Sequence, residues 1–181
     1  MSKVNFDDKN GTQDFSEIQK VAEAGEPGAQ FVLGGMYLLK QDYAEAFSWF
    51  KKAAEAGDTE AQFYLSIMYK NGEGVEQNHA QAFLWAKKAA EAGHIETQFG
   101  LAGMYFSGEG VGQNYAEAFS WCGKAAEAGH TEAQYNLGLM YAKGDGVKQN
   151  YTKALSWFEK AAEAGHTEAQ YKLDLVCGSR G

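Results

Sequence analysis

A small set of residue patterns in this chain could do chemistry. Ser48-Trp49-Phe50-Lys51 matches S-x-x-K, the motif that carries the serine nucleophile of class A β-lactamases and penicillin-binding proteins. The SDN and KTG elements that accompany it in those enzymes do not occur in the sequence. The serine recurs as Ser120 and Ser156 without the lysine. We therefore interpret the match as a coincidence and expect no catalytic residues.

Three histidines recur every 36 residues, as His94, His130 and His166, with Asp58 at the same place in an earlier copy. Zinc ligands converge within about 2.1 Å of one point. Equivalent residues of stacked helical repeats lie about 8 to 10 Å apart, which is a helix-packing distance. We therefore predict that these residues begin helices, and we expect neither a metal nor another cofactor.

Two further patterns have structural explanations. Gly72-Glu73-Gly74-Val75 suggests a phosphate-binding loop, but Gln77 stands where the third glycine of G-x-G-x-x-G would be needed. The two glycines instead allow a positive φ where a helix ends. Cys122 and Cys177 fall at different places in the repeat, unlike a disulfide framework, so we expect buried thiols in a reducing compartment.

All these residues belong to a sequence repeated about every 36 residues, which predicts stacked repeats. A flexible lead-in is expected before the array and a short tail after it. The expected segments are a lead-in at 1–13, a half repeat at 14–25, full repeats at 26–57, 58–93, 94–129 and 130–165, a half repeat at 166–177, and a tail at 178–181.

Each full repeat predicts two helices. In the first helix, Leu65, Met68 and Tyr69 form one apolar stripe, and Thr59 with Gln62 fits a capping box. A small residue follows the leucine in every full copy, which predicts that another helix crosses closely there. These small residues are Gly34, Ser66, Ala102 and Gly138.

The second helix carries one tryptophan per copy, and we expect these indoles to be buried between neighbouring helices. An asparagine or aspartate precedes this helix as its N-cap, and a glycine follows it at the position where helices end. The tryptophans are Trp49, Trp85, Trp121 and Trp157; the N-caps are Asp42, Asn78, Asn114 and Asn150; the glycines are Gly57, Gly93, Gly129 and Gly165.

The motifs AQF/Y-x-LG-x-MY, GxGV, QNY-x-x-A and W-x-x-KAAEAG, with the 36-residue period, resemble Sel1-like repeats, which are relatives of tetratricopeptide repeats. The resemblance covers roughly residues 14–177. It implies an all-α fold, a right-handed α-solenoid (α/α superhelix) of helix-turn-helix repeats whose first helices line a concave face. It also implies an adaptor role in bacterial signalling or host interaction, or in eukaryotic protein-quality-control complexes.

By similarity to tetratricopeptide arrays, a partner would bind outward-facing positions of the first helices. Every first helix carries an aromatic residue at the same position of the repeat, and these residues either belong to the core, which we favour, or face a ligand. They are Phe31, Phe63, Phe99, Tyr135 and Tyr171. The other binding candidates are Tyr64, Ile67, Lys70, Phe106 and Asn136. We expect a peptide to lie in this groove with aromatic anchors.

Two functions follow from the resemblance. The first is a non-enzymatic protein-protein interaction scaffold, which we expect. The alternative is a hydrolase or small-molecule binder, because cysteine-rich secreted members of the Sel1 family are associated with binding or hydrolysing β-lactams. Those members show regular cysteine pairs, which this chain lacks. The repeat positions also supply no clustered acid, base and nucleophile.

Charge and composition restrict the partner. The 181 residues carry a net charge of -8, which disfavours nucleic acid and favours a cationic protein or peptide. One acidic series is explained either by helix dipoles or by such a partner: Glu60, Glu96, Glu132 and Glu168. The sequence shows no export signal and no membrane span, so we expect a cytoplasmic monomer that does not bind membranes.

Overall fold

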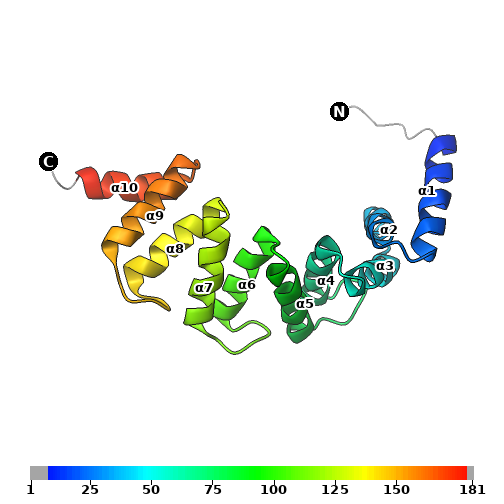
Figure 1. Cartoon of the computed structure of the whole chain (residues 1–181), viewed down its shortest axis with the longest axis horizontal. Helices are drawn as coiled ribbons and strands as arrows, with labels where there is room; N and C mark the ends of the chain where they lie inside the picture. Colours follow the sequence, from blue (N-terminus) through cyan, green and yellow to red (C-terminus); the bar gives the residue numbers. More distant parts are fainter. Residues whose placement is uncertain (1–7, 179–181) are drawn as a thin grey trace. The chain divides into compact units, whose positions relative to one another are not determined.

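The computed structural model describes the backbone of residues 8–178 and the side chains of residues 15–174. This part of the chain forms ten α-helices and no strand (Figure 1). The chain divides into two compact units, Met1–Trp85 and Ala86–Gly181, and the boundary falls within helix α5 (His79–Glu91). The all-α class predicted from the sequence is confirmed.

The first unit contains α1 (Asp8–Glu23), α2 (Pro27–Leu39), α3 (Tyr43–Glu55) and α4 (Thr59–Asn71), and each of these helices packs on the next (Figure 1). Helix α1 begins at Asp8, so helical backbone occupies the second half of the expected lead-in. The remainder of that lead-in lies outside the described residues.

The second unit continues with α6 (Ile95–Ser107), α7 (Tyr115–Glu127), α8 (Thr131–Lys143), α9 (Tyr151–Glu163) and α10 (Thr167–Gly178), and consecutive helices again pack together. Of the expected tail, only Gly178 is described. Each unit is thus a series of helix-turn-helix repeats of the α-solenoid class. None of the described helices is both long and apolar enough to cross a bilayer.

The two helices of a repeat approach each other closely at Gly34 and at Gly138, the small residues of two of the first helices. A Cβ atom placed on Gly34 would lie 2.8 Å from the Phe50 ring, and one on Gly138 would lie 2.6 Å from the Phe158 ring. Real Cβ atoms do not approach other atoms that closely, so glycine is required at both positions. The prediction of a close crossing is confirmed there.

The predicted caps of the second helices are confirmed. Asp42, Asn114 and Asn150 accept hydrogen bonds from backbone N–H groups of the first turn, and Asn78 accepts one from Gln81. The predicted helix-ending glycines all have positive φ: Gly57, Gly93, Gly129 and Gly165.

The capping box predicted for the first helices is wrong. Thr59 is the first helical residue, and Asp58 is the N-cap whose carboxylate accepts from Ala61 at 2.8 Å. Gln62 Nε2 instead donates to the carbonyl of Ala54, at the end of the preceding helix. Because Asp58, one residue before Thr59, caps the helix, the side chain of Gln62 is available to link α4 to α3.

The tryptophans are packed between helices. Trp49, Trp85 and Trp121 are only 7%, 8% and 7% exposed, whereas Trp157 is half-buried. The Nζ atom of Lys124 lies 3.6 Å from the centre of the Trp121 ring and makes a cation–π contact with that indole.

The loop glycines hold successive repeats in contact. Gly146 has φ +72°, and a Cβ atom there would overlap the carbonyl oxygen of Tyr115, at the start of the second helix of the preceding repeat. Gly74 meets Tyr43 in the same way in the first unit. Glycine is needed at this place for its backbone conformation and for its lack of a side chain.

Replacing Trp121 by alanine should lower the free energy of unfolding by about 3 to 5 kcal/mol, because it empties a buried indole site. Denaturation followed by circular dichroism measures the change. Trp157→Ala is the matched control, and its loss should be smaller because that indole is half-buried. A loss of less than about 1 kcal/mol for Trp121→Ala would contradict this packing.

Gly146→Ala should destabilise the chain by about 2 kcal/mol or more, since it adds both backbone strain and an overlap. Gly112 provides the control because a Cβ atom there meets nothing within 4 Å. Gly112→Ala should change the unfolding free energy by no more than about 0.5 kcal/mol. Equal thermal stability of the two variants would show that the loop does not depend on Gly146.

Candidate functional site

A pocket of about 200 Å³ lies in the second unit, between the first helices α6 and α8 and against the second helix α7. We call it the α6–α8 pocket. Its residues are Phe99, Ala102, Gly103 and Phe106 of α6, Ala118 and Cys122 of α7, Asn136, Leu139, Met140 and Lys143 of α8, and Asp145 of the following loop.

The walls of the pocket are mainly apolar. Phe99 is half-buried, and Phe106 is 42% exposed and meets Tyr115 edge-on at 5.0 Å. Met140 is buried, and Leu139 is half-buried. An open pocket with aromatic and aliphatic walls favours an apolar guest.

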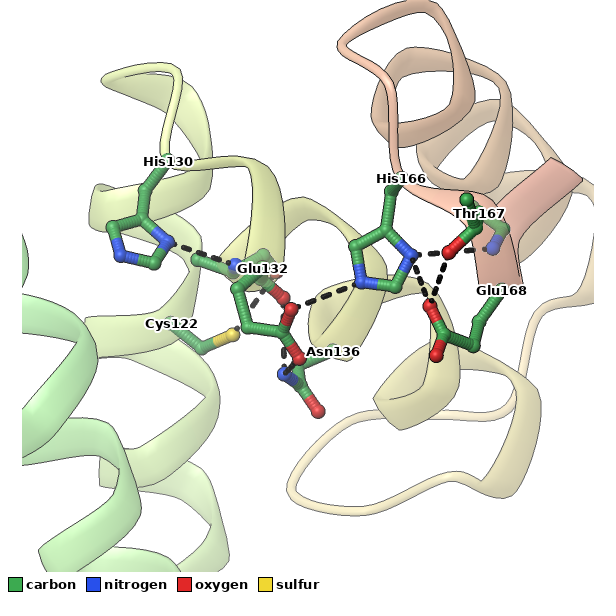
Figure 2. Close-up of polar contacts among 9 residues, drawn as sticks. Cys122, His130, Glu132, Asn136, His166, Thr167 and Glu168 are labelled. Atoms are coloured by element: carbon green, nitrogen blue, oxygen red, sulfur yellow. Dashed lines mark hydrogen bonds and ion pairs between the residues drawn. The ribbon is translucent and has the colours of Figure 1, made fainter.

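Cys122 forms part of the buried side of the pocket, with 2% of its surface exposed. Its thiol donates to the carbonyl of Ala133, with Sγ and O 3.4 Å apart (Figure 2). Burial raises the pKa of Cys122 to about 12, so the thiol is neutral near pH 7. Because the thiolate is the nucleophilic form, this buried neutral thiol is a weak nucleophile near pH 7.

A chain of polar contacts positions Asn136 at the pocket. Its Nδ2 donates to the Glu132 carbonyl at 2.9 Å and lies 3.4 Å from Glu132 Oε1. The other oxygen of that carboxylate lies 3.0 Å from His166 Nε2 (Figure 2). No described residue donates to the amide oxygen of Asn136.

Two of the recurring histidines, His130 and His166, link successive first helices. His130 Nδ1 accepts from Ala133 N at 3.1 Å as the N-cap of α8, so the proton of the neutral ring is on Nε2, which donates to Glu96 at 3.0 Å. The ring also stacks on Phe99, with centroids 4.7 Å apart. The helix-start role predicted for the histidines is confirmed, while their pairing with the acidic series was not predicted.

The other binding candidates lie outside this pocket. Phe31 and Tyr64 pack against the core of the first unit, where Tyr64 stacks on Phe50 with centroids 4.9 Å apart. Phe63 contacts Tyr64 edge-on at 5.6 Å. Ile67 is half-buried on α4. These side chains are wholly or partly used in packing.

The remaining three candidates lie on different helices and differ in exposure. Lys70 is exposed at the end of α4. Tyr135 packs between His166 and Phe158, with centroid distances of 4.3 and 5.6 Å. Tyr171 is 62% exposed on α10. Of the predicted residues, the pocket therefore brings together Phe99, Phe106 and Asn136.

Ala102, Cys122, Lys143 and Asp145 were missed as pocket residues. A signal for Cys122 was present, because the equivalent place in other repeats holds Phe50 and Phe158. A cysteine leaves space where two of the other copies hold a ring, while the copy at 58–93 has Ala86 there. That signal shows only when residues of two helices are considered together.

The motif Ser48-Trp49-Phe50-Lys51 does not form a reactive pair. Ser48 is exposed on α3, and the Nζ atom of Lys51 lies 3.9 Å from Glu55 Oε1. In the described part of the chain, no three His, Cys, Asp or Glu side chains lie together as a metal site would require.

The comparison with protein families agrees with this geometry. A family described as Sel1 repeat matches residues 27–58, 59–94, 95–130 and 131–166. The chain belongs to the Sel1 repeat family. No curated protein sequence matches it.

Two solved structures are similar to this Sel1 repeat protein. The c5321 protein, a protective antigen of uropathogenic Escherichia coli strains, is 40% identical with a TM-score of 0.85 over 90% of this chain. A Sel1 repeat protein of Oxalobacter formigenes is 36% identical with a TM-score of 0.82 over 91% of this chain. The chain covers only 36% and 49% of those two proteins.

Helicobacter pylori cysteine-rich protein B is similar in fold alone, at 24% identity and a TM-score of 0.53. That similarity covers 66% of this chain and 91% of the H. pylori protein.

The raised pKa of Cys122 predicts an unusual pH profile for thiol modification. In a Cys177→Ser variant, the rate of reaction with Ellman's reagent should rise about tenfold per pH unit from about pH 8 to 10, because the thiolate fraction is still far from saturation. The rate for an ordinary exposed thiol would instead level off above its usual pKa of about 8.5. A plateau at about pH 9 in the native protein would show that Cys122 is not desolvated, and the denatured protein provides the control.

Proposed function

We propose that this Sel1 repeat protein is a non-enzymatic interaction scaffold that binds a peptide or protein on the face of α6 and α8. Sel1 and tetratricopeptide-like repeats are generally protein-interaction scaffolds. The α6–α8 pocket is the observation that supports this proposal most, because two successive first helices contribute to one open, apolar pocket.

The composition of the pocket suits a peptide. Phe106 and Lys143 are exposed, and Asp145 is half-buried. Charged groups beside apolar walls resemble protein interfaces, in which a few buried anchors supply most of the binding energy and polar groups surround them. The acceptor oxygen of Asn136 could bind a backbone or side-chain N–H group of the peptide.

The net charge of -8 also favours one kind of partner by its charge. Its field attracts cationic chains and repels the phosphate backbone of nucleic acids. We therefore propose a partner with basic residues beside its apolar anchor. The basic residues would speed association more than they would strengthen the final complex.

Selection from a displayed random-peptide library tests this proposal. Enriched peptides should bind the wild type by fluorescence anisotropy, and Phe106→Ala should weaken binding about tenfold or more by removing an exposed aromatic wall. The control is Tyr151→Ala, because Tyr151 is 65% exposed and lies on α9, outside the pocket. Circular dichroism should show that both variants are folded.

The scaffold proposal fails if no peptide is enriched, or if Phe106→Ala and Tyr151→Ala bind the enriched peptides as the wild type does. Incubation with a chromogenic β-lactam tests the hydrolase alternative separately. Turnover by the purified chain would contradict the non-enzymatic assignment.

A further inference from the structure

We propose that the α6–α8 pocket binds an aromatic ring, supplied by a phenylalanine, tyrosine or tryptophan side chain of the partner. This inference rests on the proposed scaffold function and specifies its anchor. It comes from comparing the pocket with the same place in the first and the fourth full repeats of this chain, where a phenylalanine of the protein's own second helix occupies the space.

In the first unit, the equivalent four positions of two successive repeats hold three packed aromatic rings and a glycine. Phe50 is fully buried, and its ring stacks on Tyr64 with centroids 4.9 Å apart and planes 10° apart. Phe31 lies 5.7 Å from Phe50 on another side. The ring of Phe50 fits because Gly34 has no side chain.

The same four repeat positions in the second unit all line the pocket. Phe99 corresponds to Phe31, Ala102 to Gly34, Cys122 to Phe50 and Asn136 to Tyr64. The two rings that fill the cluster in the first unit are thus replaced by a thiol and an amide. The pocket lies where those rings would be.

The next repeat shows that the replacement is coupled across two helices. Phe158 is 6% exposed, lies 5.6 Å from Tyr135, and packs against Gly138. Phenylalanine on the second helix thus occurs twice with glycine on the first. Cys122 instead occurs with Ala102, whose methyl group occupies part of the space that a phenylalanine would need.

The size and chemistry of the pocket suit a ring. An apolar cavity of about 150 Å³ binds benzene, so 200 Å³ is sufficient for a phenyl or phenol group. The walls offer Phe99 and Phe106 for aromatic contacts and the sulfur atoms of Met140 and Cys122 for sulfur–aromatic contacts. These contacts favour an aromatic over an aliphatic side chain of equal size.

Filling the pocket from within tests the inference. The double variant Ala102→Gly with Cys122→Phe installs the glycine–phenylalanine pair that the chain already uses twice. It should fold with an unchanged or higher melting temperature because it fills empty space. Gly123→Ala is the matched control on the same helix, since a Cβ atom there meets nothing within 4 Å.

The probe is p-cresol, the side-chain group of tyrosine, titrated into isotope-labelled protein and followed by NMR. In the wild type and in Gly123→Ala, the amide signals of Gly103 and Asn136 should shift saturably. In the double variant the affinity should fall about tenfold or more. If the double variant does not fold, Asn136→Tyr provides a second way to fill the pocket, as Tyr64 does in the first unit.

The peptides selected on the wild type provide the second arm. Replacing their aromatic residue by leucine, or using the double variant, should each weaken binding about tenfold or more.

Peptides that bind without an aromatic residue and equally well to the double variant would overturn the inference but leave the scaffold function standing. Saturable binding of p-cresol without any enriched peptide would support a ring-binding pocket and overturn its assignment to a peptide partner. Absence of saturable p-cresol binding would overturn the ring-binding pocket itself.

Discussion

The close approach of the two helices within each repeat is the constraint on which the rest of the structure depends. At Gly34 and Gly138 no side chain fits between the helices, because the ring of Phe50 or Phe158 occupies that space. The volumes of the two positions are therefore coupled: a ring on the second helix requires a glycine on the first. Where the pair is instead Ala102 and Cys122, the helices still pack, but open space remains between α6 and α8.

Contacts between successive repeats maintain the backbone around that space. Gln134 donates to the carbonyl of Ala126 at the end of the preceding helix, and Gly146 contacts the carbonyl of Tyr115. His130 caps α8 while it binds Glu96 of α6 and stacks on Phe99. Apart from Phe99, these links use residues that do not line the pocket, so they hold α6 and α8 in place with little contribution from Ala102, Cys122 or Asn136. The centre is consequently free to vary, and a variable position within a rigid frame is where binding specificity is least costly to change.

Much of the fold was predictable because its signals are local and repeated. Helix-ending glycines, asparagine N-caps and the tryptophan phase occur at the same places in successive copies, and each reflects a preference of one or two residues. The capping box at Thr59 and Gln62 failed because Asp58, which the sequence also predicts at a helix start, offers a competing acceptor one residue earlier and is the N-cap. Phe99, Phe106 and Asn136 were found as candidates because they lie on the first helix. Phe31 and Tyr64, on the same kind of helix, pack instead with Phe50 of the second helix.

By itself, the sequence determined that this chain is an array of helix pairs of the Sel1 type, and it identified the N-caps and the closing glycines of the second helices and the burial of most of the tryptophans. The tertiary structure decided which of several similar positions forms a pocket. A pocket is the volume left over among side chains from three helices, and it depends on the sum of their sizes and on the distance between the helices. The preference of a single residue for helix or for burial carries no information about that sum. From the sequence, Cys122 is therefore an ordinary buried thiol, and only the structure shows that it lines a pocket together with Ala102 and Asn136.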